Sequence, residues 1–173
     1  FPILASTAAA AILVGGRTFH SFFGIGILEG GYQATLERAL RNRKLTKRLK
    51  KAKTVIIDEV SMLSGTHLRL AEEVARMSLK TDLPWGGLRI IAVGDFAQLP
   101  PVNVFGPDRE WAFLNSVWEK SGFIPVLLTE VMRTQDSHYL SVLGDVRQGR
   151  VTPRVRDFLN SRLSDPNTAF EGT

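Results

Sequence analysis

The run from Val55 to Glu59 constrains the fold of this chain more than any other feature, because three apolar residues end in two adjacent carboxylates. Such a run is typical of a buried parallel strand. A second apolar run follows and ends in the polar segment 94–102, which reads GDFAQLPPV. Parallel strands bring their carboxyl ends to one edge, where open α/β sheets bind ligands. The sequence therefore predicts an α/β fold with a parallel sheet and a site at that edge.

The composition fits one globular domain, since 44% of the 173 residues are hydrophobic. Cysteine is absent, which excludes disulfides, thiolate metal sites and cysteine nucleophiles. No apolar run reaches the length of a membrane span, and the first five residues lack the basic flank and the length of a signal peptide. We therefore expect a protein that has no membrane partner and is not secreted.

The net charge of +5 is concentrated in one segment. Nine basic residues and no acidic ones lie between positions 38 and 53, namely Arg38, Arg41, Arg43, Lys44, Lys47, Arg48, Lys50, Lys51 and Lys53. Without these nine, the chain holds 13 basic and 17 acidic residues, a net charge of −4. Two interpretations are open. One is a patch that attracts a polyanion, and the other is a solvated helix face beside an apolar stripe of Leu36, Leu40, Leu45 and Leu49.

Apolar runs alternate with helical patterns along the chain, as in parallel α/β proteins. We expect strands at Ile3–Ser6, Thr54–Asp58, Leu88–Gly94 and Phe123–Thr129. We expect helices across 68–79, across 111–118, from Ser137 to Gln148 with Tyr139, Leu143 and Val146 inward, and from Thr152 as N-cap. The glycine-rich stretch from Gly15 to Tyr32 fits the alternation poorly. It is either an inserted subdomain or an excursion over the sheet.

The paired carboxylates suit the hydrolysis of a nucleoside triphosphate. In this interpretation Asp58 supports a Mg²⁺ shell and Glu59 orients or deprotonates water, because adjacent strand residues point in different directions. Gln98 is a candidate to bond a γ-phosphate or the attacking water, and Arg133 to stabilise the transferring phosphate. The alternatives are an acidic strand end or helix N-cap, a surface amide and a solvated arginine. The phosphate-loop pattern G-x-x-x-x-G-K-[ST] does not occur in the sequence.

The segment 18–23, which reads TFHSFF, interleaves hydrogen-bonding groups with aromatic rings. Single-stranded nucleic acid is bound by such a mixture, with hydroxyls on phosphates and rings on bases. The alternative is that the three phenylalanines are core residues and that His20 is a buried, hydrogen-bonded histidine. His20, His67 and His138 have no metal-ligand spacing, so we expect no metal-ligating histidine.

Taken together, these segments resemble the PIF-type DNA helicases, the 5′-to-3′ branch of helicase superfamily one. Residues 7–11 (TAAAA) with 15–26 (GGRTFHSFFGIG) are similar to motif Ia of that family. Residues 55–63 (VIIDEVSML) are similar to motif II, 94–102 to motif III, and 128–133 (LTEVMR) to motif IV. The resemblance runs from about residue 4 to 163 in the order and spacing of the family. Two departures are Ala8, where a glycine is usual, and Thr134, which separates Arg133 from Gln135.

The resemblance implies a three-layer RecA-like core of a P-loop NTPase, with residues 1–173 as part of the first motor domain. Residues 24–52 would then hold an inserted subdomain and a basic helix. It also implies roles: Asp58 supports Mg²⁺, Glu59 is the catalytic base, Gln98 senses the γ-phosphate and Arg133 contacts it. Thr18, His20 and Ser21 would contact the DNA strand.

The resemblance further implies an ATP-dependent helicase with ATP and Mg²⁺ as cofactors, and with single-stranded, forked or duplex DNA as partner. DNA repair, recombination and telomere maintenance are the expected roles. We expect a monomer, in the nucleus or mitochondrion of a eukaryote or in the cytoplasm of a bacterium.

We also expect the phosphate-loop strand just upstream of residue 1 and a second motor domain beyond residue 173. The chain alone would then be inactive and marginally stable. A non-catalytic module that binds single-stranded nucleic acid is the alternative function.

Overall fold

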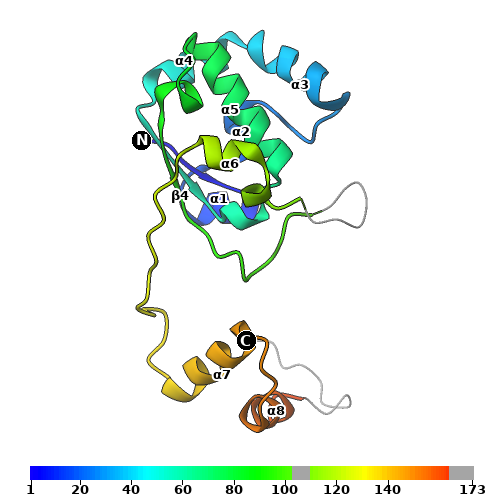
Figure 1. Ribbon diagram of the computed structural model, residues 1–173, viewed down its shortest axis with the longest axis vertical. Coiled ribbons are helices and arrows are strands. Elements are labelled where there is room, and N and C mark those ends of the chain that lie inside the picture. Colours follow the sequence, from blue (N-terminus) through cyan, green and yellow to red (C-terminus); the bar gives the residue numbers. More distant parts are fainter. Residues whose placement is uncertain (103–109, 164–173) are drawn as a thin grey trace. The chain divides into compact units, whose positions relative to one another are not determined.

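Four parallel strands form the centre of the structure, a computed structural model that describes residues 1–102 and 110–163. The chain divides into two units, Phe1–Ile124 and Pro125–Thr173, coloured blue to yellow-green and yellow to red in Figure 1. The strands are β1 (Ile3–Ala5), β2 (Arg17–Thr18), β3 (Thr54–Asp58) and β4 (Arg89–Ala92). The α-helices are α1 (Ala8–Leu13), α2 (Phe19–Phe23), α3 (Gly31–Leu40), α4 (Arg43–Lys51), α5 (Gly65–Leu79), α6 (Ser116–Lys120), α7 (Ser137–Arg147) and α8 (Pro153–Asn160). Short 3₁₀ helices are η1 (Val60–Met62), η2 (Pro84–Gly87) and η3 (Ala112–Leu114).

The strand order is β2-β1-β3-β4, and every neighbouring pair is parallel. Ala5 of β1 lies opposite both Thr18 of β2 and Asp58 of β3, so three strands end at one level. The expected parallel α/β sheet is thus confirmed, as are the strands that contain β1, β3 and β4. The two-residue β2 was not predicted, because two residues carry no periodicity.

The core lies between one face of the sheet and a layer of helices centred on α5. Leu4, Val55 and Ile57 are fully buried on that face. Helix α5 contacts α2, α3, α4 and α6, and α3 and α4 lie beside it in Figure 1. Its predicted apolar stripe is confirmed, since Leu68, Ala71 and Ala75 are fully buried and Leu79 is partly buried. Burying a leucine side chain stabilises the fold by about 1.5–3 kcal/mol, so this stripe is a main support of unit 1.

The opposite face of the sheet is less covered. Ile3, Ile56 and Ile91 are in register across β1, β3 and β4, and Ile91 is 38% exposed. Among the described residues, β4 has no strand partner on its outer side. No helix within residues 1–102 and 110–163 is long and apolar enough to cross a bilayer.

Residues 24–52 contribute side chains to the same hydrophobic core as the sheet. Ile25, Leu36, Leu45 and Leu49 belong to the same buried cluster as β1 and β3, and Leu40 packs against that cluster. The predicted apolar stripe beside the basic run is therefore confirmed. Asn42 begins α4, because its side-chain oxygen accepts hydrogen bonds from the backbone N–H groups of residues 44 and 45. The boundary of an inserted subdomain stays a prediction.

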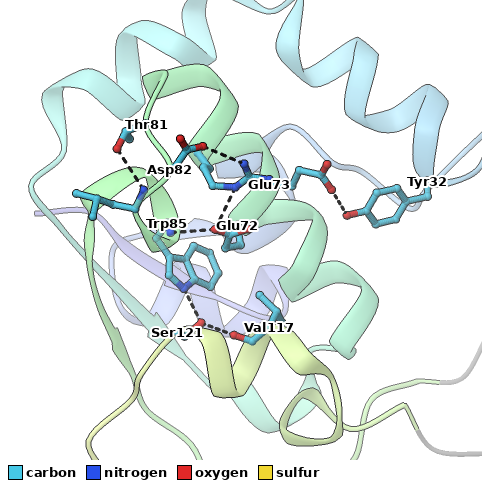
Figure 2. A network of polar contacts seen from close by, with 10 residues as sticks. Tyr32, Glu72, Glu73, Thr81, Asp82, Trp85, Val117 and Ser121 are labelled. Atoms are coloured by element: carbon cyan, nitrogen blue, oxygen red, sulfur yellow. Dashed lines mark hydrogen bonds and ion pairs between the residues drawn. The ribbon is translucent and has the colours of Figure 1, made fainter.

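A polar network on α5 fixes the surrounding segments (Figure 2). The Tyr32 hydroxyl donates to Glu73 Oε2 at 2.6 Å, and burial together with this bond raises the pKa of Tyr32 above its usual range. Glu72 Oε1 accepts the backbone N–H of Trp85 at 3.2 Å. The indole N–H of Trp85 donates to Ser121 Oγ at 2.8 Å. Helix α5 thereby holds α3, the turn before β4, and the end of α6 in place.

Two sequence predictions about the middle of the chain need correction. Phe123–Thr129 is not a strand, although its residues are as apolar as those of β3. A strand needs a neighbouring backbone to accept and donate its hydrogen bonds, and no described strand pairs with this segment. The expected helix across 111–118 is instead η3 followed by the five-residue α6, because Asn115 is extended and caps α6.

Unit 2 contains the two expected helices α7 and α8, with the predicted Thr152 N-cap and Pro153 in the first turn of α8. The inward set predicted for α7 is wrong. Tyr139, Leu143 and Val146 are 37%, 43% and 52% exposed, whereas Val142 and Asp145 are buried. The side of α7 that faces α8 thus carries Asp145, which is bonded to residues of the following segment.

The buried carboxylate of Asp145 is bonded to two arginines that are about half exposed. Its Oδ1 accepts from Arg150 Nη2 at 2.8 Å, and its Oδ2 accepts from Arg154 Nη2 at 2.6 Å and from Thr152 Oγ1 at 3.0 Å. These bonds, led by that of Arg154, hold the pKa of Asp145 below its ordinary value. Three donors that follow α7 in the chain thus join it to α8.

Candidate functional site

The carboxyl ends of the strands lie side by side at one edge of the sheet, as predicted. Thr18 and Asp58 both lie beside Ala5, and the chain after β4 passes close to the residues after β3. The backbone N–H of Val60 donates to Val93 O at 3.0 Å. A Cβ on Gly94 would lie 3.0 Å from both the backbone nitrogen and Cγ1 of Val60. Glycine is therefore needed at position 94 for the two segments to approach each other.

Asp58 and Glu59 lie at this edge, and both are half-buried. Asp58 Oδ1 accepts the backbone N–H of Glu59 at 3.0 Å. Glu59 itself has φ 53° and ψ 44°, in the left-handed region, and begins η1. A non-glycine residue in this region costs about 1–3 kcal/mol, and such strain is concentrated at functional sites. The two predicted roles of Asp58 and Glu59 stay predictions.

The carboxylate of Asp58 fits one kind of metal site and not another. In nucleotide sites Mg²⁺ takes one or two carboxylates, and phosphate oxygens and water complete its shell. Across residues 1–102 and 110–163, no three acidic or histidine side chains gather into a group that holds a metal ion. Asp58 therefore suits a metal that arrives with a phosphate ligand, and the described residues form no metal cage of their own.

Gln98 lies in a turn built on Asp95. The Ala97 N–H donates to Asp95 Oδ1 at 3.0 Å, and Gln98 Nε2 donates to Asp95 Oδ2 at 3.2 Å. Gln98 is exposed, and its side-chain nitrogen is thus engaged by Asp95 in this structure. The sequence analysis did not predict that Asp95 holds this turn. An Asp two residues before a turn N–H is its only sequence signal.

An aromatic cluster anchors the same segment. The ring centroid of Phe96 lies 6.0 Å from that of Trp111, 5.0 Å from that of Phe113 and 5.5 Å from that of Trp118. These edge-to-face contacts connect the segment after β4 to η3 and α6. Sequence reasoning placed Trp111 and Trp118 on a helix but gave no signal that Phe96 would contact them.

Thr18 and Ser21 of the predicted DNA-binding set lie together at the start of α2. Thr18 Oγ1 caps this helix by accepting the Ser21 N–H at 3.2 Å, and Arg17 Nη2 donates to Ser21 Oγ at 3.3 Å. Phe19, Phe22 and Phe23 are at most 1% exposed. Of the two interpretations of these rings, the one that makes them core residues is confirmed, and they are not accessible for stacking on bases. Hydroxyl and guanidinium groups remain available at this surface.

His20, the third predicted DNA contact, lies against a second histidine. The ring centroids of His20 and His67 are 4.8 Å apart, and Ser64 Oγ lies 2.7 Å from His67 Nδ1. Burial, with a smaller contribution from the charge of His67, lowers the pKa of His20 to about 4. Burial also lowers the pKa of His67. The pair is therefore neutral near pH 7 and offers hydrogen bonds there without positive charge.

Arg133 belongs to unit 2 and is exposed on the segment before α7. Next to it, Thr134 Oγ1 accepts the backbone N–H of Asp136 at 3.2 Å, which begins the turn into α7. The expected contact of Arg133 with a phosphate stays a prediction.

The chain matches known sequences over nearly its full length. The family model of PIF1-like helicases matches residues 3–154. A Bdellovibrio bacteriovorus protein named ATP-dependent DNA helicase Pif1 is 56% identical over 172 residues. The match covers 99% of this chain and 39% of that protein. An Emericella nidulans protein named ATP-dependent DNA helicase PIF1 is 36% identical over 175 residues, and 23% of its length is covered.

Solved structures give the same result. The crystal structure of Pif1 helicase from Candida albicans superposes with a TM-score of 0.85 at 35% identity, over 99% of this chain and 39% of that one. A Bacteroides Pif1 helicase in complex with ADP-AlF3 and ssDNA superposes with a TM-score of 0.79 at 28% identity, over 98% of this chain and 42% of that one. The expected fold class is thereby confirmed, and the chain spans about two fifths of these structures.

Proposed function

Because the chain belongs to the PIF1-like helicase family, we propose that it forms part of the first motor domain of an ATP-dependent 5′-to-3′ DNA helicase. The observation that carries the proposal is the Asp58-Glu59 pair at the carboxyl end of β3, with Glu59 held in a strained backbone conformation. Hydrolysis of ATP at this edge would drive movement along single-stranded DNA and the unwinding of duplex DNA.

In this proposal each acidic side chain has one role. Asp58 supports the shell of a Mg²⁺ ion that binds with the nucleotide, and the ion screens the charge of the phosphates. Glu59 orients the attacking water and accepts its proton. The related Bacteroides helicase was crystallised in complex with ADP-AlF3, which supports nucleotide binding by the intact protein.

Gln98 and Arg133 act on the γ-phosphate. Gln98 Nε2 carries two N–H groups, so one can donate to a phosphate oxygen while the other keeps its bond to Asp95 Oδ2. The same amide would then connect nucleotide binding to the turn that carries Phe96. Arg133 would stabilise the charge that develops on the transferring phosphate.

Thr18, His20 and Ser21 contact the DNA strand on the side of β2. Neutral hydrogen-bonding groups of this kind fix a backbone without reading its sequence. Related structures contain ssDNA or are described as unwinding forked dsDNA by two coordinating helicases. DNA is therefore the proposed partner, and the expected monomeric state stays a prediction.

The test measures ATP hydrolysis by the full-length protein that carries this sequence, with and without single-stranded DNA. Glu59→Gln removes the base and keeps the shape of the side chain, so turnover should fall about 10²- to 10⁴-fold. Affinity for single-stranded DNA should stay within about twofold, since Glu59 is not a proposed DNA contact. The matched control is Glu119→Gln on α6, which removes the same charge from an exposed site.

Retained turnover in Glu59→Gln would contradict its role as the base. DNA binding without any DNA-stimulated turnover in the unaltered protein would favour the alternative, a non-catalytic binding module.

A further inference from the structure

A groove with a volume of about 490 Å³ opens at the other edge of the sheet. Five cationic side chains line it: Arg17, Lys44, Lys47, Arg48 and Lys51. Two further residues that line this basic groove lie just before strands. Pro2 directly precedes β1, and Ala52 lies two residues before β3. The backbone N–H of Ile56 donates to Pro2 O, which fixes Pro2 at the amino end of the sheet.

The basic groove is separate from the proposed nucleotide site. Asp58 ends β3, whereas Ala52 precedes that strand. Five strand residues span roughly 16 Å, at about 3.3 Å for each residue. A ligand in the groove therefore does not contact the carboxylates that are proposed to act on ATP.

Four of the five cations come from one face of α4. Lys44, Lys47, Arg48 and Lys51 follow the spacing i, i+3, i+4 and i+7, which places them on one side of a helix. The buried Leu45 and Leu49 hold the opposite side against the core. With about 1.5 Å of rise for each residue, the row of cations is roughly 10 Å long.

None of these five cations forms an ion pair with a carboxylate in the described part of the chain. Like charges three and four residues apart on a helix repel one another. Burial lowers the pKa of Arg48, and the nearby charge of Arg17 lowers it further. An anionic ligand would supply the missing counter-charge.

Arg17 and Arg48 join the groove to the surface around Ser21. Arg17 Nη2 donates to Ser21 Oγ at 3.3 Å. Arg48 Nη2 donates to the backbone oxygens of Ser21 and Phe22, and its guanidinium lies 5.0 Å from the centre of the Phe22 ring. The basic groove is therefore continuous with one of the proposed strand contacts.

We propose that the basic groove binds the phosphate backbone of the nucleic acid, as a second contact region beyond Thr18, His20 and Ser21. The proposal rests on the proposed function, because it takes DNA as the partner. Phosphates of one strand follow one another at about 3.4 Å along a duplex axis, so a row of roughly 10 Å covers about three of them. The groove adds affinity and direction to the bound strand but reads no bases.

The test compares two double variants of α4 in the full-length protein. Lys44→Gln/Lys51→Gln removes two charges from the groove, and Arg43→Gln/Lys50→Gln removes two from another face with the same seven-residue spacing. All four residues are exposed, so both variants should fold, which thermal unfolding checks. Fluorescence anisotropy with a labelled single strand and with a labelled duplex gives the dissociation constants from 50 to 300 mM salt, a range of about sixfold.

We expect the groove variant to bind about tenfold more weakly at 0.1 M salt, and the control variant to stay within about twofold. The slope of log K against log salt should decrease by about 1.4 for a single strand, or by about 1.8 for a duplex, when two phosphate contacts are lost. A decrease of the slope with one probe and not with the other shows which form of DNA lies in the groove.

Equal weakening by both double variants would overturn the proposal, because it would indicate diffuse attraction to a solvated helix face. Unchanged DNA binding by the groove variant would overturn it as well and would leave an acidic protein as the candidate ligand. Failure of the proposed function gives different results: a protein without DNA as its partner would bind neither probe even when unaltered, and a loss of the helicase role alone would appear in the ATP turnover assay and leave the comparison of the two double variants intact.

Discussion

The two edges of the sheet carry opposite charges and are built in different ways. At the carboxyl edge, Asp58 ends strand β3, and Glu59 and Asp95 lie in tight backbone turns, of which that of Glu59 is left-handed. At the amino edge, four of the five cations of the basic groove extend from one regular helix face. Acidic groups that act on a phosphate must be placed to within a fraction of an ångström. Cations that hold a polyanion need only be close to it, and long flexible side chains on a helix suffice.

The difference teaches where each edge is sensitive to mutation. The amino edge depends on the apolar side of α4, because loss of that packing moves four of the five cations at once. The carboxyl edge depends on backbone geometry, because its groups lie in turns. Three substitutions or titrations separate these two dependencies.

The largest effect on stability is expected from Leu49→Ala beneath the basic groove. Leu49 is fully buried, and removal of a buried leucine side chain costs about 2–5 kcal/mol. Urea unfolding of the variant measures the loss. Lys50→Ala, which alters the exposed neighbour, should change the free energy of unfolding by no more than about 0.5 kcal/mol. Equal effects at the two positions would mean that α4 does not pack through its leucines.

A smaller loss is expected at the carboxyl edge from Gly94→Ala. The added methyl group would lie 3.0 Å from the backbone nitrogen of Val60 and 3.2 Å from that of Ser61. Separating these segments should cost about 1–3 kcal/mol in the free energy of unfolding. ATP turnover should decrease as well, because η1 positions Glu59. Gly144→Ala on α7 is the control, since a Cβ there meets no atom within 4 Å.

The smallest effect near neutral pH is expected from the histidine pair. The pKa of His20 is about 4 in the folded chain, whereas an unfolded histidine titrates near 6.5. Below pH 6.5 the unfolded chain takes up a proton that folded His20 does not, so stability falls as the pH decreases toward 4. The free energy of unfolding then decreases by up to about 1.4 kcal/mol for each unit by which the pH falls.

His20→Gln should reduce this dependence in urea unfolding between pH 7 and pH 4.5, and the exposed His138→Gln should leave it unchanged. A slope that is the same in the unaltered protein and in His20→Gln would show that His20 is already charged when folded.

The sequence predicted features that rest on local patterns. The core of β3, the apolar stripe of α5 and the cap of α8 follow from neighbouring residues, and all three were predicted. The position of Asp58 and Glu59 at a carboxyl edge followed from the same logic. The strand at Phe123–Thr129 was predicted wrongly, because strand formation depends on a partner that an apolar run cannot report.

Contacts between distant residues were the other part that the sequence did not reveal. His20 and His67 are 47 positions apart, and the ring of Phe96 reaches Trp111 and Trp118 across a long connection. The left-handed backbone of Glu59 was also unsignalled, since glutamate rarely adopts it. The hydrogen bond from Gln98 to Asp95 was not predicted either, because the sequence does not show which way a side-chain amide points.

The left-handed backbone of Glu59 sets stability and chemistry against each other in evolution. Glycine adopts this conformation without strain, so Glu59→Gly would relieve a cost of about 1–3 kcal/mol. The same change would delete the proposed catalytic carboxylate. A selection for well-folded protein alone would favour the glycine, whereas a selection for turnover would reject it at once. Position 59 is therefore one at which a lineage that no longer needed ATP hydrolysis would change early.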